Sequence, residues 1–182
     1  MNQAQLYFTV RPMVETDARA ILNWRYETPY DFYNAGSVNP DEALKEMLDG
    51  SHYAVFDVRG SLAGFFAFGP TATVPGGTKF GLYTDDALDI GLGMRPGLTG
   101  CGLGLSFVRA GVDFARKNLG ASALRLSVAT FNRRAIVVYQ RAGFNSGPIF
   151  PSATSGDGVT EFLLMTLASV NDAETTGKGA RL

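Results

Sequence analysis

Apolar and polar residues along this chain follow two periodicities, one typical of helices and one of strands. Apolar side chains recur at three-to-four spacing over residues 103–118, with charged residues elsewhere, which predicts an amphipathic helix. Leu124, Leu126 and Val128 alternate with polar residues and predict a half-buried strand. Asn132 and Gly143 then delimit a second helix over residues 133–142.

The first half of the chain predicts shorter elements. Apolar runs indicate strands at residues 6–10, 53–59, 62–68, 80–83 and 87–94, and the pair Gly60-Ser61 is typical of a hairpin turn. Helices are expected over 15–25, with Thr16 or Asp17 at the start, and over 40–48. Residues 69–79 are expected to be a loop, and 144–150 and 161–167 to be the final strands.

Composition limits the classes of protein that this chain can represent. Its 182 residues suit a single domain, and a net charge of −1 with a pI of 5.8 argues against non-specific nucleic-acid binding. One cysteine and one histidine exclude a disulfide framework within the chain and any Cys- or His-rich metal site. No segment resembles a signal peptide or a membrane span, so we expect no membrane partner and a cytoplasmic location.

A glycine-rich turn precedes the 103–118 helix. Gly100, Gly102 and Gly104 let successive backbone N–H groups point into one concavity at a helix N-terminus, which favours an anion such as a diphosphate. The spacing does not fit a dinucleotide fingerprint, because Leu105 stands at its third glycine position, and no Gly-Lys-Ser/Thr follows as in a P-loop. A flexible loop whose glycines pack against a neighbouring helix is the alternative.

Two segments together resemble the GNAT superfamily of N-acetyltransferases. Residues 94–104 are similar to its coenzyme A signature, with Met94, Pro96, Gly102 and Gly104 in register and Thr99 at the usual Arg/Gln position. Downstream, a second segment resembles the element after the fifth strand of that fold, on the residues Asn132, Ala135, Tyr139, Gly143 and Phe144.

The resemblance implies an α+β GNAT fold over residues 1–168, followed by a flexible tail at 169–182. Its central sheet is mixed and mostly antiparallel, flanked by helices, with splayed fourth and fifth strands. Gly91 and Gly93 are interpreted as places where the fourth strand meets a ligand. The resemblance further implies acetyl-CoA as co-substrate, without a metal, in contact with Leu92, Met94, Thr99, Gly100, Cys101, Gly102, Leu103, Gly104, Asn132 and Arg134.

The same resemblance assigns catalytic roles. Tyr139 is expected to protonate the departing thiolate, and Asp89 to act as general base, although a carboxylate at a strand end that works only through water, or not at all, is an open alternative. An amine of a small molecule or a peptide is expected to bind against Trp24, Tyr26, Tyr30 and Tyr33, which alternatively pack over the sheet. The exposed sheet edge is compatible with a homodimer. A non-catalytic module that binds acyl-CoA is the alternative function.

Overall fold

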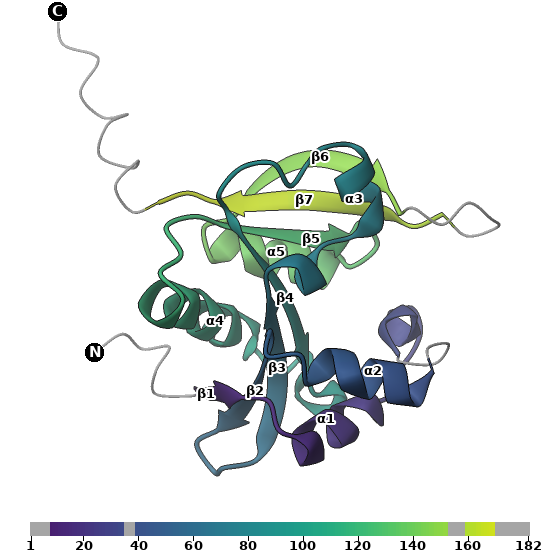
Figure 1. The fold of residues 1–182 in the computed structure, drawn as a ribbon, viewed down its shortest axis with the longest axis vertical. Helices are drawn as coiled ribbons and strands as arrows, with labels where there is room; N and C mark the ends of the chain where they lie inside the picture. Colours follow the sequence, from purple (N-terminus) through teal and green to yellow (C-terminus); the bar gives the residue numbers. More distant parts are fainter. Residues whose placement is uncertain (1–7, 35–38, 153–158, 170–182) are drawn as a thin grey trace, which may run out of the picture.

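The computed structural model describes residues 8–34, 39–152 and 159–169. Within them, seven strands form one mixed sheet in the order β1-β2-β3-β4-β5-β7-β6 (Figure 1). The strands are β1 (Phe8–Pro12), β2 (His52–Asp57), β3 (Leu62–Phe68), β4 (Leu88–Met94), β5 (Leu124–Ala129), β6 (Asn145–Pro151) and β7 (Glu161–Leu167). All neighbours are antiparallel except β4 and β5, which are parallel. The expected mixed and mostly antiparallel α+β sheet is confirmed.

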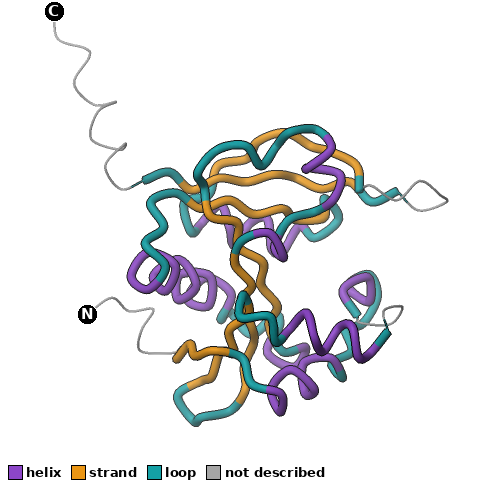
Figure 2. The backbone as a smooth tube through the Cα atoms, in the orientation of Figure 1, coloured by secondary structure: helices purple, strands orange, loops and turns teal. Residues whose placement is uncertain are grey.

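Helices cover both faces of this sheet (Figure 2). They are α1 (Glu15–Leu22), α2 (Pro40–Met47), α3 (Pro75–Lys79), α4 (Gly104–Asn118) and α5 (Arg133–Arg141). Successive side chains of a strand point to opposite faces. Phe66 of β3 packs on Phe107 of α4, whereas Phe65 packs with the buried residues of α1 and α2. The helix α4 and the pair α1–α2 therefore lie on opposite faces of β3.

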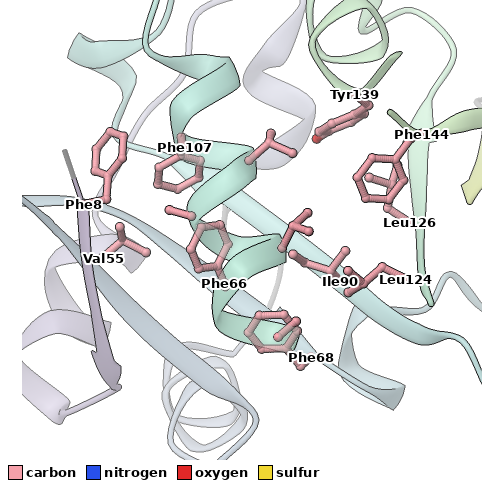
Figure 3. Packing of buried hydrophobic residues seen from close by; sticks show 14 of the residues in the cluster. Phe8, Val55, Phe66, Phe68, Ile90, Phe107, Leu124, Leu126, Tyr139 and Phe144 are labelled. Atoms are coloured by element: carbon pink, nitrogen blue, oxygen red, sulfur yellow. The ribbon is translucent and has the colours of Figure 1, made fainter. Parts of the chain in front are cut away.

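The main core lies between the sheet and the helices α4 and α5. Phe8, Phe66 and Phe107 meet at one end of it, and Tyr139 of α5 packs beside Phe144 at the other (Figure 3). These side chains come from the predicted apolar face of the 103–118 helix and from alternating strand positions. Their burial holds α4 and α5 side by side, with both N-termini close to β4 and β5.

The strands β4 and β5 pair over a short stretch only. Their parallel register contains Leu88 opposite Leu124 and Asp89 opposite Arg125, and no further pair among the described residues. Beyond this point β4 continues along β3, while β5 continues along β7, so the two strands diverge (Figure 1). The expected splay of the fourth and fifth strands is thus present.

The structure corrects three local expectations. Residues 80–83 form a turn after α3, not a strand, and Tyr83 fixes this turn by accepting the N–H of Val74 at 3.0 Å. The helix expected over 15–25 ends at Leu22, and its N-cap is Val14. Asp17 does not cap the helix but lies in its first turn, the other position expected for it, where it is buried and forms an ion pair with Arg11 at 2.8 Å.

None of the helices in the described ranges combines the length and the apolar character needed to cross a bilayer. The expected tail at 169–182 lies outside the described residues, except for its first residue.

Candidate active site

A cavity of about 570 Å³ opens where β4 and β5 diverge. Backbone and side chains of residues 90–94 line one side and residues 126–128 the other, while the starts of α4 and α5 and the connector after α1 complete it. A volume of this size suits a drug-sized ligand. The sheet topology thus creates the cavity, because the ladder between β4 and β5 stops at Asp89 and Arg125.

The backbone of β4 turns N–H groups toward this cavity. Gly64 and Met94 face each other across β3 and β4, and the bond from Arg95 N to Ala63 O at 2.8 Å flanks them. They are therefore a non-hydrogen-bonded pair, in which the N–H and C=O of Met94 point away from β3. The alternation places the N–H of Leu92 in the same direction. Both N–H groups face the gap left by the divergence of β5.

The glycine turn has the geometry that the sequence predicts. Gly100 and Gly102 have φ values of 80° and 77°, in the region that favours glycine, and a Cβ at either would meet no atom closer than 4.0 Å. No side chain caps the following α4, and its first turn contains no acidic residue. Its first N–H groups, with the helix dipole, form a positive end that suits an anion.

The other residues of the turn have different surroundings. Thr99 lines the cavity, but its hydroxyl donates to Pro96 O at 2.8 Å and so closes the local turn. Gly104 allows α4 to approach α5, because a Cβ there would lie 3.1 Å from Val138. Cys101 is exposed and Leu103 packs against the core; among the described residues, neither is part of the cavity lining.

Gly91 and Gly93, which were expected where the backbone of the fourth strand meets a ligand, also lie close to neighbouring side chains. A Cβ at Gly93 would lie 2.3 Å from the Phe65 ring, and one at Gly91 would lie 3.4 Å from the Cβ of Ala72. The missing side chain of Gly93 therefore makes room for the Phe65 ring, whereas a Cβ at Gly91 would be in ordinary van der Waals contact. Both residues still line the cavity, through their backbone.

Helix α5 brings Asn132 and Tyr139 to the cavity. The Asn132 side chain accepts the N–H of Ala135 at 3.2 Å, as expected of an N-cap, and its amide donates to the Tyr33 hydroxyl at 3.3 Å. Tyr139 lies two turns further, lines the cavity and is only 8% exposed. Burial, and to a lesser extent Tyr33, raises the pKa of the Tyr139 phenol well above its usual range. Tyr139 is therefore held as a protonated donor.

Substitution of Asn132 separates its two contacts. Asn132→Ala removes the N-cap and is expected to lower the free energy of unfolding by about 1 kcal/mol. Asn132→Asp keeps a capping oxygen but loses the amide that donates to Tyr33, so its stability should stay close to that of the wild type. Urea unfolding of both variants measures this difference. An equal loss in the two variants would contradict the capping role.

The four aromatic residues expected in the acceptor site all line the cavity. The Tyr26 hydroxyl donates to Met94 O at 2.8 Å, and burial raises the pKa of Tyr26 to about 12. Asn34 closes the connector by accepting Tyr26 N at 2.7 Å and donating to Tyr26 O at 3.2 Å. Tyr30 and Tyr33 reach the other half of the sheet and pack against Phe131.

Arg134 lines the same cavity from the first turn of α5. Its guanidinium carbon lies 4.0 Å from the centroid of the Tyr30 ring, a cation–π geometry. The position next to the glycine turn, 4.0 Å from where a Gly100 Cβ would be, places its charge beside the N-terminus of α4. The turn and Arg134 together give this end of the cavity a positive character.

The structure does not support Asp89 as a general base. Both carboxylate oxygens accept from the Arg125 guanidinium at 2.8 Å, and the side chain is nearly buried. Asp89 is absent from the cavity lining in the described part of the chain. Arg125, 2% exposed, also pairs with Asp85 at 2.6 Å and lies over the Tyr83 ring. This ion cluster closes the end of the β4–β5 ladder.

Sequence reasoning missed the apolar part of the cavity. We call this part the apolar wall; it consists of Ile21, Leu22, Trp24, Met47 and Phe65. Trp24 was expected from the aromatic connector. The other four lie on regular elements, where an apolar residue pointing into a cavity has the same pattern as one pointing into a core. No sequence signal separates the two.

Comparisons with known proteins agree with this geometry. The model of the GNAT acetyltransferase domain matches residues 8–145, which is most of the chain. No curated protein sequence matches the chain.

Several solved structures are similar to this one. A chimera of the Vibrio cholerae spermidine N-acetyltransferase and hSSAT has a TM-score of 0.70 at 18% identity, covering 92% of this chain and 98% of its own. The Vibrio cholerae enzyme in complex with CoA and spermine has a TM-score of 0.68 at 17% identity, covering 89% and 95%. A GNAT acetyltransferase from Bacillus anthracis has a TM-score of 0.67 at 12% identity, covering 88% and 94%.

At these identities the structural similarity shows a shared fold, whereas the domain match spans both motif segments. The chain belongs to the GNAT family of acetyltransferases.

Proposed function

We propose that this protein transfers an acetyl group from acetyl-CoA directly to a primary amine. The main support for the proposal is that three groups meet around one cavity: the glycine turn, the N–H groups of β4 that face away from β3, and the buried phenol of Tyr139. An anion-binding end, a pair of hydrogen-bond donors and a proton donor are the groups that a thioester with a phosphorylated carrier needs. A Vibrio cholerae structure with the same fold contains CoA.

Each part of the lining has a place in this proposal. The N–H groups of Gly100, Gly102 and the first turn of α4, with Arg134, would hold the diphosphate. Asn132 would contact the pantetheine arm with the amide that now donates to Tyr33. The N–H groups of Leu92 and Met94 would donate to the thioester oxygen, where negative charge develops during transfer.

The reaction balances with these groups. A neutral amine nitrogen attacks the thioester carbon, the C–N bond forms, and the C–S bond breaks. The leaving sulfur takes the proton of the Tyr139 hydroxyl, and the extra proton of the amine nitrogen passes through water to the Tyr139 phenolate, which restores the phenol. The raised pKa of Tyr139 keeps this proton in place until a thiolate forms beside it.

The turn offers a direct test of its role in binding acetyl-CoA. Gly102→Ala places a side chain at a φ of 77°, which costs about 1–2 kcal/mol. The loop relieves this strain by leaving the cradle geometry, so the affinity for acetyl-CoA should fall about 5- to 30-fold. Isothermal titration calorimetry measures the affinity of wild type and variant for acetyl-CoA.

Gly97→Ala is the matched control, because Gly97 lies in the same turn without a positive φ and a Cβ there meets nothing within 4 Å. An equal loss of affinity in both variants would mean that the positive φ of Gly102 is not what binding requires.

Thermal unfolding with and without acetyl-CoA tests whether the co-substrate is correctly identified. A ligand at 100 times its dissociation constant stabilises a protein by about 2.7 kcal/mol. For a chain of this size the midpoint should rise by roughly 5–10 °C, and NAD should leave it unchanged. No rise at millimolar acetyl-CoA would overturn the proposal. The proposed function also includes a homodimer that forms through the exposed edge strand β6.

A further inference from the structure

The charged residues that line the cavity are all of one sign. Arg134 and Arg141 line the cavity, whereas no aspartate or glutamate does so among the described residues. The acidic residues of the connector, Glu27 and Asp31, are exposed and outside this lining. The undescribed residues 35–38, which continue the connector, read Ala-Gly-Ser-Val and contain no acid. In the described part of the chain, a cation entering the cavity would therefore find no carboxylate in the lining.

One of the aromatic rings in the lining is already occupied by a cation. An aromatic cluster can hold a cation over its ring faces, but the Arg134 guanidinium already lies 4.0 Å from the Tyr30 centroid. The Tyr26 hydroxyl donates to Met94 O, and the Tyr33 hydroxyl accepts from Asn132. The Tyr26 hydroxyl is therefore engaged with the backbone, and the Tyr33 hydroxyl is engaged until the Asn132 amide turns to a bound carrier, so the two rings present mainly carbon to the cavity.

The apolar wall completes the description of this side. Ile21 and Met47 are buried, Leu22, Trp24 and Phe65 are half-buried, and all five pack in one cluster formed by α1, α2 and β3. Binding an apolar ligand against such a surface is favourable in free energy, whereas moving an ammonium group from water to this surface costs free energy.

We propose that the acceptor is a primary amine with an aromatic or aliphatic body, which binds as the neutral free base against the apolar wall. This inference rests on the proposed function for its chemistry, and it separates this chain from a polyamine acceptor such as the spermine in the Vibrio cholerae complex. It also explains how the reaction proceeds without a carboxylate base in the cavity lining of the described residues, because the nitrogen arrives with its lone pair free.

The first test uses wild-type protein and ligands that do not react. Isothermal titration calorimetry compares 2-phenylethanol, a neutral isostere of 2-phenylethylamine, with phenethyltrimethylammonium and with spermidine, each with and without CoA. We expect the neutral ligand to bind at least tenfold more tightly than either cation. Tighter binding of a cation, or no binding of 2-phenylethanol at millimolar concentration, would overturn the inference. This readout needs no turnover, so it fails independently of the proposed function.

A pair of variants tests the location of the site. Leu22 ends α1 and is half-buried in the apolar wall. Leu22→Glu adds the missing carboxylate, and Leu22→Gln adds the same volume without the charge. The ratio of kcat/KM for spermidine to that for 2-phenylethylamine should rise at least tenfold in Leu22→Glu and stay near the wild-type ratio in Leu22→Gln. An unchanged ratio in both would place the acceptor elsewhere.

The pH dependence supplies the third measurement. If only the free base binds, kcat/KM for 2-phenylethylamine rises tenfold per pH unit until the pH reaches the pKa of the amine. A plateau well below that pKa would indicate a protein base acting on a bound ammonium, which contradicts the inference.

Discussion

Replacing Tyr139 by phenylalanine should lower kcat by about 10²- to 10⁴-fold, the usual contribution of a positioned acid. The substitution removes only the hydroxyl, and the ring keeps its place in the core beside Phe144, with centroids 6.2 Å apart. The thiolate would then leave without a proton donor, because no other described residue is assigned this role in the cavity. Steady-state kinetics with acetyl-CoA and an amine measure the loss.

Two controls separate this effect from a change in structure. The rise in unfolding midpoint caused by acetyl-CoA should be the same in Tyr139→Phe and in the wild type. Tyr53→Phe removes a hydroxyl from β2, where the ring packs on Phe68 and Phe114 outside the cavity lining, and should keep the wild-type rate. An unchanged kcat in Tyr139→Phe would remove this tyrosine from the mechanism.

Arg125→Met should lower the free energy of unfolding by about 3–5 kcal/mol, the typical result of removing one partner of a buried ion pair. Arg125 is 2% exposed and makes two bonds of 2.8 Å to Asp89. The variant leaves the Asp89 carboxylate nearly buried without its counterion, at the point where the β4–β5 ladder ends. Thermal unfolding should show a midpoint lower by roughly 6–20 °C.

The cluster itself provides the matched controls. Combining Arg125→Met with Asp89→Leu removes both charges and should recover most of the lost stability. Asp85 is 67% exposed, so Asp85→Ala removes a solvated partner of Arg125 and should cost no more than about 1 kcal/mol. A loss in Arg125→Met as small as that in Asp85→Ala would show that the buried pair does not hold the strands together.

Regular elements with strong periodicity could be predicted from the sequence. The apolar face of α4 and the Asn132 cap of α5 are local patterns, and the structure has both. A strand forms at β5 as expected, but it is buried on both faces and not half-buried, because Arg125 lies 2% exposed in the ion cluster with Asp89. The short helix α3 was missed because its sequence, Pro-Gly-Gly-Thr-Lys, is poor in helix-forming residues. It forms because Tyr83 and the residues around it pack on β5 and β7.

In the candidate site, too, local motifs could be predicted and long-range contacts could not. The glycine turn is one continuous stretch of sequence, and so is the segment from Asn132 to Tyr139. The chemistry of each could therefore be predicted from the sequence. The pairing of Asp89 with Arg125 joins residues 36 positions apart through the parallel register of two strands, and it turned an expected base into a structural ion pair. The bond from Tyr26 to Met94 spans 68 positions. Such contacts depend on the complete fold, and no local sequence pattern predicts them.

The central claim is that acetyl groups pass from acetyl-CoA to an amine in the cavity between β4 and β5. The most direct measurement follows CoA thiol release and N-acetylated product together, with wild-type protein, acetyl-CoA and 2-phenylethylamine, spermidine or a peptide N-terminus as acceptor. The account predicts one product molecule for each CoA released, fastest with 2-phenylethylamine. Binding of acetyl-CoA without amine-dependent CoA release from any acceptor would contradict it and leave a module that binds the thioester without transferring its acetyl group.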